Sequence, residues 1–129
     1  MLAFDTNVLV RLFANDDSKQ HLTVVRLLRK EPIWISKTVL LETEWVLRSG
    51  YGFSPDRIQE ALTRLLGLPN VDVEDASIVA QALLWVPQGL DFADALHLAA
   101  AQRQGAFATF DQKLAKRCHR LGLDARLLT

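Results

Sequence analysis

Short, mostly apolar runs that alternate with longer amphipathic segments are the feature that most constrains the fold of this chain. Every run except the last is followed by a segment long enough to form at least one helix. Strands connected in this way pair in parallel, and helices cover both faces of the resulting sheet. The sequence therefore predicts an α/β protein, with strands at 2–4, 33–35, 71–73, 107–109 and 125–127.

Hydrophobic periodicity and capping residues predict the helices between these strands. Ser54 followed by Pro55 is a typical helix start, and Gly105 is a typical helix stop. No repeat, low-complexity tract or linker interrupts the pattern, so we expect residues 1–129 to form a single domain. The predicted helices are 7–13, 18–29, one from 36 or 38 to about 48, one from 54 to about 67, 74–85, 91–104, and one that starts at Asp111.

The composition restricts the setting and the class of function. Lys and Arg number 15, and Asp and Glu number 15, which argues against a protein that depends on non-specific attraction to phosphates. The single cysteine, Cys118, excludes an internal disulfide, and we expect it at a half-buried helix position and not as a nucleophile. The N-terminus lacks a basic signal-peptide region, and no apolar run approaches a membrane span. We therefore expect a soluble, cytoplasmic protein.

Acidic residues recur where a parallel sheet of this kind would form a site. Asp5 follows the first predicted strand and Asp111 follows the fourth, while Asp91 and Asp94 open the alanine-rich helix. Because the carboxyl ends of parallel strands share one edge of the sheet, we expect Asp5 and Asp111 to converge. Helix capping is the alternative role for Asp5, Asp91 and Asp111, since Asp is a favoured N-cap residue.

Glu42 and Asp94 are not explained by capping. Apolar residues flank both of them at helical spacing, and no basic residue stands at that spacing from either one. A buried, unpaired carboxylate is costly, so a bound cation is the simplest explanation for both. Glu44 differs, because Arg48 lies one helical turn later and can pair with it at the surface. Thr6 is expected to cap the first helix.

A divalent cation also explains how four carboxylates could share a site. Two like charges about 5 Å apart repel by roughly 3 kcal/mol at an effective dielectric constant of about 20. Oxygen ligands favour Mg²⁺ or Mn²⁺ over zinc, and the three histidines have no zinc-type spacing. We expect His97 to be a packing residue, Asn7 to orient Asp5 or a metal-bound water, and Thr109 to hydrogen-bond a carboxylate or a phosphate.

Four segments together resemble the PIN domain, and in particular the VapC-like toxins of bacterial and archaeal toxin–antitoxin pairs. Each segment alone is weakly specific, whereas their order and spacing fit the family over nearly the whole chain. The segments are 2–9 (LAFDTNVL), 39–42 (VLLE), 91–97 (DFADALH) and 108–111 (ATFD).

The resemblance implies a three-layer α/β/α sandwich with a central, mainly parallel sheet. It implies Mg²⁺- or Mn²⁺-dependent hydrolysis of RNA, with products that carry a 5′-phosphate and a 3′-hydroxyl. A cognate antitoxin protein and a homodimer are also implied. The implied metal-binding and catalytic residues are Asp5, Glu42, Asp94 and Asp111, with Asn7, Asp91 and Thr109 in supporting positions. Candidates for an apolar docking surface, or equally for the core, are Trp45, Leu47, Tyr51 and Phe53.

Three alternatives to a toxin nuclease are open. A phosphoaspartate protein is disfavoured, because the phosphatase pattern requires a second acid where Asn7 stands. A non-catalytic PIN-like binding module is disfavoured by the complete set of four acids. A PIN nuclease of RNA processing would differ only in its target and partner. Basic residues that either contact RNA or form a solvated surface are Arg48, Lys113, Lys116, Arg117, His119 and Arg120.

Overall fold

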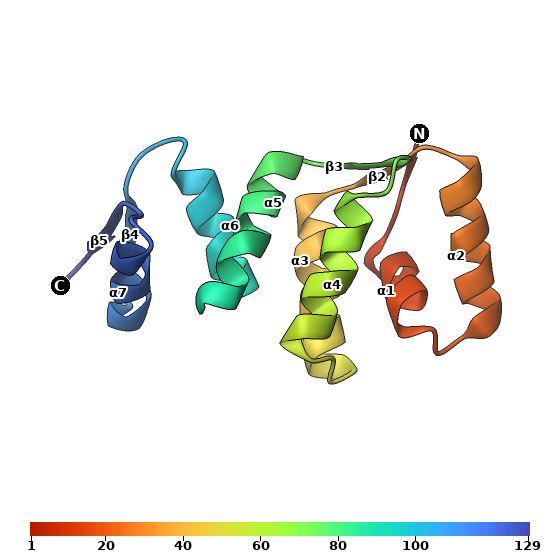
Figure 1. The fold of residues 1–129 in the computed structure, drawn as a ribbon, viewed down its shortest axis with the longest axis horizontal. Helices are drawn as coiled ribbons and strands as arrows, with labels where there is room; N and C mark the ends of the chain where they lie inside the picture. The colour runs from red at the N-terminus through yellow and green to blue at the C-terminus, as the bar shows by residue number, and fades with distance from the viewer. The chain divides into compact units, whose positions relative to one another are not determined.

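The computed structural model describes all residues from 1 to 129. It consists of two compact units, the N-terminal unit Met1–Ala76 and the C-terminal unit Ser77–Thr129 (Figure 1). Each unit combines helices with a parallel sheet of its own.

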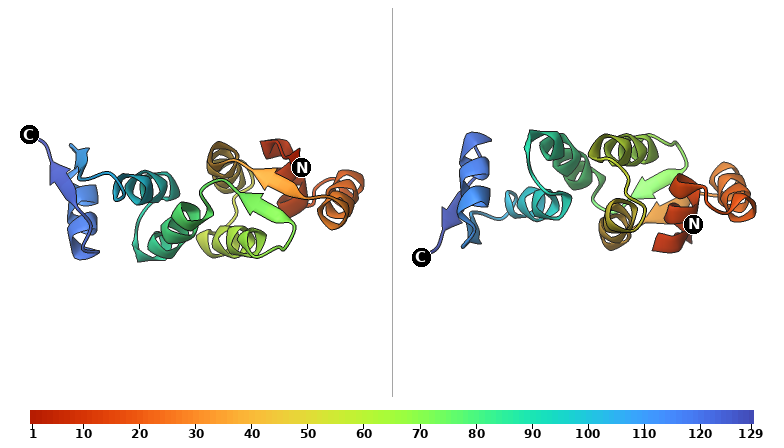
Figure 2. Two further views of the ribbon diagram at one scale, coloured as in Figure 1. Left: turned by 90° about the horizontal axis from the view of Figure 1, so that it is seen from above. Right: turned by 90° about the horizontal axis from the view of Figure 1, so that it is seen from below.

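Three parallel strands form the sheet of the N-terminal unit. The central strand pairs with the first strand on one side and with the third on the other, so that Leu2 lies opposite Ile33 and Ile33 opposite Val71. The helices of this unit are grouped around the strands (Figure 2). Its elements are β1 (Leu2–Ala3), α1 (Thr6–Ala14), α2 (Ser18–Lys30), β2 (Ile33–Ile35), α3 (Lys37–Trp45), the π-helical turn η1 (Val46–Gly50), α4 (Pro55–Leu66) and β3 (Val71–Val73).

The core of the N-terminal unit is built on β2. Ile33 and Ile35, which share one face of this central strand, are completely buried, while Trp34 on the other face is half-buried. Leu9 of α1, Leu40 of α3 and Leu65 of α4 are also fully enclosed. Apolar residues from three helices thus form one core with the buried face of β2.

The C-terminal unit contains one strand–helix–strand motif. β4 and β5 pair in parallel, with Phe107 opposite Ala125, and α7 connects them and packs against both. The buried face of α7 consists of Leu114, Ala115 and Cys118. The elements are α5 (Ala76–Trp85), the 3₁₀ turn η2 (Val86–Gln88), α6 (Phe92–Ala101), β4 (Phe107–Thr109), α7 (Gln112–Arg120) and β5 (Ala125–Leu127).

The predicted α/β class with parallel strands is confirmed. The strands at 33–35, 71–73, 107–109 and 125–127 have the predicted bounds, while the first strand ends at Ala3. The predicted caps also form, because Ser36 and Ser54 each accept a hydrogen bond from the backbone amide three residues later.

Three helix boundaries differ from the prediction by two residues or more. The helix predicted to reach Gln104 ends at Ala101. The helix predicted to reach about residue 48 leaves α-helical geometry at Val46, where the amide of Tyr51 bonds the Val46 carbonyl and closes a π-turn. The helix predicted from Glu74 begins at Ala76. Asp75 has a positive φ of 49°, and the amide of Glu74 still bonds the carbonyl of Ile35 as a continuation of the sheet.

Burial corrects two further predictions. Cys118 is completely buried and not half-buried, because it occupies the centre of the inner face of α7. Leu47 and Phe53 belong to the core, whereas Trp45 is 58% exposed and Tyr51 is also exposed. The proposed docking surface therefore reduces to the two exposed aromatic side chains. None of the helices is long and apolar enough to span a membrane.

Candidate functional site

The first candidate acid, Asp5, stands between β1 and α1. Its backbone is extended, and its Oδ1 accepts a hydrogen bond of 2.8 Å from the amide of Thr6, the first residue of α1. Asp5 is thus the N-cap residue, as the capping alternative predicted. Thr6 was expected to be the cap, but it lies one position inside the helix and its hydroxyl is used elsewhere.

Thr6 connects Asp5 to the second candidate acid, Glu42. The Thr6 side chain is buried, and its hydroxyl donates a short hydrogen bond to Oε1 of Glu42 on α3. A buried hydroxyl needs a partner, and here the partner comes from a segment 36 residues away. Two carboxylates from different elements are therefore joined through one residue.

The orientation of α3 corrects the predicted environments of Glu42 and Glu44. Glu42 is exposed and does not point along a buried apolar face, whereas Glu44 is only 7% exposed. The buried side of α3 and η1 carries Leu40, Glu44 and Leu47, which follow one another at helical spacing. The predicted pair of Glu44 with Arg48 forms at 2.8 Å, but its carboxylate lies inside and not at the surface.

The C-terminal unit brings three acids into electrostatic contact around α6. Asp94, in the first turn of α6, is half-buried, and this burial raises the pKa of its carboxyl. The negative charges of Asp91 and Asp111 raise that pKa further, while His97 opposes them. Asp91 stands at the N-cap position of α6, but its side chain accepts no capping hydrogen bond. Capping therefore does not explain Asp91.

Asp111 is the N-cap residue of α7. Its Oδ1 accepts a hydrogen bond of 3.1 Å from the amide of Leu114, at the start of α7. Its own amide donates to the Thr109 hydroxyl at 3.0 Å. Thr109 was expected to bond a carboxylate or a phosphate, and it instead shapes the turn that presents Asp111.

The remaining predicted companions are exposed. Asn7 lies in the wall of a hollow of about 390 Å³ between α1 and α2, together with Arg11 and Gln20. His97 was predicted to be a packing residue, and this is wrong, because it is exposed beside Asp94. Its position one helical turn after Asp94 explains its influence on that carboxyl.

The sequence did not predict a polar network that lies in the N-terminal unit. The Tyr51 hydroxyl donates to Asp16 at 2.8 Å, and Arg11 contacts Tyr51, Asp16 and Gln20. The hydrogen bond with Tyr51 is the main cause that raises the pKa of Arg11 and lowers that of Asp16. The network connects α1, the start of α2 and the residue that follows η1.

The predicted quartet falls into two pairs, one in each unit. Asp5 and Glu42 are joined through Thr6, and Asp94 lies within electrostatic reach of Asp111. Neither unit by itself gathers three His, Cys, Asp or Glu side chains closely enough to hold a metal ion. The donor atoms of both pairs are carboxylate oxygens, and burial, followed by the charges of Asp91 and Asp111, raises the pKa of Asp94. Both features fit a hard divalent cation such as Mg²⁺ or Mn²⁺.

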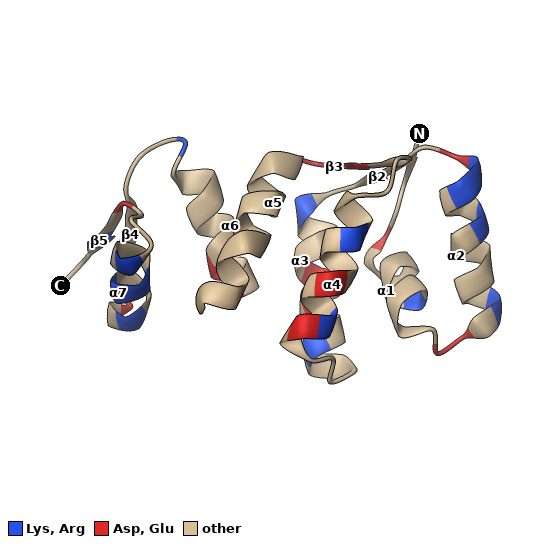
Figure 3. Cartoon of the chain, in the orientation of Figure 1, with Lys and Arg blue, Asp and Glu red and all other residues tan.

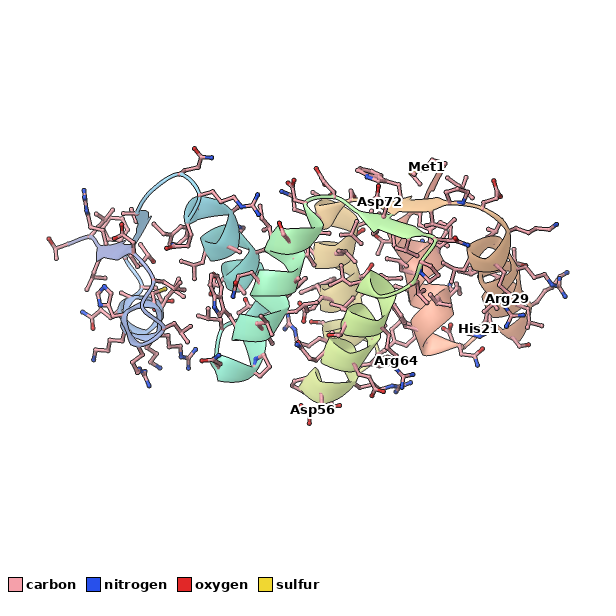
Figure 4. All side chains as sticks on the ribbon, turned by 45° about the horizontal axis from the view of Figure 1, so that its top comes forward. Met1, His21, Arg29, Asp56, Arg64 and Asp72 are labelled. Atoms are coloured by element: carbon pink, nitrogen blue, oxygen red, sulfur yellow. The ribbon has the colours of Figure 1, made fainter.

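Basic residues are concentrated on two helices (Figure 3). α2 carries Lys19, Arg26, Arg29 and Lys30, and α7 carries Lys113, Lys116, Arg117 and Arg120, all of them exposed. Arg29, for example, projects away from α2 into solvent (Figure 4). A net charge of zero thus coexists with local positive surfaces, as phosphate binding would require.

Comparison with known proteins gives one family match. The chain matches the model of the PIN domain over residues 2–119. A similar solved structure is that of VapC20 of Mycobacterium tuberculosis, a toxin that cleaves the sarcin–ricin loop. It is 25% identical, the match covers 90% of this chain and 94% of that one, and the TM-score is 0.45. None of the curated proteins compared with the chain matches it.

Proposed function

We propose, from the premise that this chain belongs to the PIN domain family, that it is a metal-dependent endoribonuclease. The observation that carries the proposal is the pairing of acids in both units. Asp5 and Glu42 are linked through Thr6, and the charges of Asp91 and Asp111 raise the pKa of Asp94. We further propose that residues 1–129 form one PIN domain, since the family match runs through both units.

In this proposal Asp5, Glu42, Asp94 and Asp111 hold Mg²⁺ or Mn²⁺. Such an ion, when bound, lowers the pKa of a water ligand and polarises the scissile phosphodiester. Asp94 or Asp5 orients the attacking water and accepts its proton. Asp91 adds negative charge next to Asp94, and Thr109 fixes the turn that carries Asp111. Asn7, exposed two residues after Asp5, is available to orient a water there.

The RNA backbone would be bound by basic side chains. Lys113 and Arg117 are exposed on α7, the helix that Asp111 caps. Arg117 also lies against the backbone of Gly89, two residues before Asp91, which puts a cation near the acids of α6. Arg48 is a weaker candidate, since its guanidinium already pairs with the buried Glu44. The expected products carry a 5′-phosphate and a 3′-hydroxyl.

The finer proposal is that the chain is the toxin of a toxin–antitoxin pair, acting in the cytoplasm as a homodimer. Support comes from the four motif segments, which resemble VapC-like toxins in order and spacing. The exposed side chains of Trp45 and Tyr51 offer apolar area for a protein partner. Co-purification of a small partner that suppresses cleavage would distinguish this role from RNA processing, in which no such inhibitor is expected.

The test of the nuclease is cleavage of labelled RNA with Mg²⁺, with Mn²⁺ and with EDTA. Wild type is compared with Asp94→Asn and with the matched control Asp72→Asn, which removes an exposed carboxylate from β3. We expect metal-dependent cleavage by wild type and the control, and none by Asp94→Asn. Equal cleavage by all three proteins would indicate a contaminating nuclease. Absence of cleavage together with absence of metal binding would favour the non-catalytic binding module.

A further inference from the structure

Thr6 contacts both candidate acids of the N-terminal unit through different atoms. Its backbone amide donates to Oδ1 of Asp5 at 2.8 Å, and its side-chain hydroxyl donates to Oε1 of Glu42. The first contact is local, whereas the second spans 36 residues and joins α1 to α3. We propose that Thr6 is the positioning residue that orients Asp5 and Glu42 toward one shared divalent cation. This inference rests on the proposed metal-dependent function.

The two contacts leave the carboxylates able to bind an ion. Each hydrogen bond uses one oxygen of its carboxylate, and the second oxygen of Asp5 and of Glu42 remains for a ligand. Both acids are exposed, while Thr6 itself is 5% exposed. Thr6 is thus a buried donor that bonds two accessible carboxylates. In metal sites, residues that do not bind the metal orient the ligands through hydrogen bonds of this kind.

The flexibility of Glu42 is the physical reason that such a donor matters. A glutamate on a helix surface has several rotamers, and restricting it to one of them costs conformational entropy. Thr6 is held firmly, because it is buried and forms the first turn of α1. Its hydroxyl therefore selects one orientation of Glu42 before any cation arrives. Asp5, the N-cap residue of α1, directly precedes Thr6 in the chain.

Thr43 provides a matched control. Like Thr6 it is buried, and it stands directly beside Glu42 in the sequence. Its hydroxyl, however, donates to the carbonyl of Val39 within α3 at 2.7 Å. Replacing Thr43 with Val removes a buried hydroxyl of the same kind without touching either acid.

The experiment measures Mn²⁺ affinity of the full chain by calorimetry in the absence of RNA. The proteins are wild type, Thr6→Val, Thr6→Ser and Thr43→Val, each checked for folding by circular dichroism. We expect Thr6→Val to weaken binding about 10- to 100-fold. Thr6→Ser keeps the hydroxyl, and Thr43→Val leaves both acids unchanged. The Mn²⁺ affinity of these two variants should stay within about threefold of the wild-type value. Rescue by Ser separates positioning of Glu42 from a mere loss of packing.

Three outcomes would overturn the inference. Equal Mn²⁺ affinity of wild type and Thr6→Val would show that the bond to Glu42 is dispensable, while the nuclease proposal would stand. A loss in Thr6→Ser as large as in Thr6→Val would assign the effect to packing and not to the hydroxyl. Absence of Mn²⁺ binding by wild type itself would remove the metal site, and with it the proposed function.

Discussion

The acids of the two units are organised in opposite ways. In the N-terminal unit a neutral donor, Thr6, satisfies one oxygen of Asp5 and one of Glu42. In the C-terminal unit the charge of Asp94 is opposed by burial and by Asp91 and Asp111, and its pKa is raised. Hydrogen bonding holds Asp5 and Glu42 in place, whereas burial and like charges disfavour the ionised form of Asp94. The attraction of a divalent cation would therefore lower the electrostatic energy most around Asp94, Asp91 and Asp111.

The largest expected effect concerns catalysis and compares one acid from each unit. Asp5→Asn and Asp111→Asn should each lower the rate of metal-dependent RNA cleavage by at least about 100-fold, because each would remove a charged ligand of the proposed metal site. Asn is a good N-cap residue, so both helix starts should persist. The measurement is the rate of RNA cleavage with Mn²⁺, with circular dichroism as the control for folding. Full activity of either variant would exclude that unit's acids from the site.

The next effect tests whether the two units unfold together. Leu9→Ala in α1 and Leu98→Ala in α6 each empty a completely buried position. Each should lower the free energy of unfolding by about 2–5 kcal/mol in urea titrations. If the units form one cooperative domain, either variant shifts a single transition as a whole. Separate transitions, with each variant affecting only one of them, would contradict the single-domain proposal.

A smaller effect distinguishes the two acids at helix starts in the C-terminal unit. Asp111→Ala should cost about 1 kcal/mol of stability, because the hydrogen bond to the Leu114 amide is lost. Asp91→Ala should cost less than about 0.5 kcal/mol, since Asp91 makes no capping bond and its removal relieves Asp94. Urea denaturation of the metal-free proteins checks the difference. Equal losses would mean that Asp91 also acts as a cap.

The smallest effect is a dependence of stability on pH. Because the pKa of Asp94 is raised in the folded protein, its ionisation destabilises the fold as pH rises through that value. Below the unfolded pKa of about 3.9 the penalty is absent. Metal-free Asp94→Asn should therefore melt at a higher temperature than wild type at pH 7, and the difference should vanish near pH 3.

Saturating Mn²⁺ provides the internal control for that comparison. The ion should stabilise wild type at pH 7 and remove or reverse the advantage of Asp94→Asn, because only the carboxylate attracts it strongly.

Glu42→Gln offers a contrast from the other unit. Its amide oxygen can still accept the Thr6 hydrogen bond, and no comparable gain in metal-free stability is expected. If Glu42→Gln raised the melting temperature of the metal-free protein as much as Asp94→Asn, the acids of the two units would not differ in this way.

The sequence located the secondary structure well where its determinants are local. The strands at β2, β3, β4 and β5 and the starts of α3 and α4 follow from short apolar runs and from Ser caps, which act over a few residues. The end of α3 was not predictable in this way. A π-turn and an α-helical turn differ by one hydrogen-bond partner, and η1 exists where the buried Leu47 and the following Phe53 meet the core.

The roles of Glu42 and Glu44 illustrate what local pattern leaves open. Both sides of α3 carry apolar residues, so periodicity does not decide which glutamate faces inward. Tertiary packing buries Leu40 and Leu47, which brings Glu44 inside with Arg48 as its partner and leaves Glu42 outside. Glu42 was proposed as a metal ligand because it was expected to be buried and because the resemblance to the PIN domain implies an acid at this position. The first reason is wrong, and Glu42 stays a candidate through the second and through its hydrogen bond with Thr6.

By itself, the sequence determined the α/β class, most element boundaries and the four acids to consider, because propensities, caps and motif spacing act along the chain. Tertiary structure alone decided that Thr6 bonds Glu42 and that the negative charge of Asp111 acts on Asp94. It also decided that Cys118 is fully enclosed. These features depend on contacts between residues far apart in sequence and on the removal of water from them. Neither the long-range contacts nor the exclusion of water can be predicted from the residues adjacent in sequence.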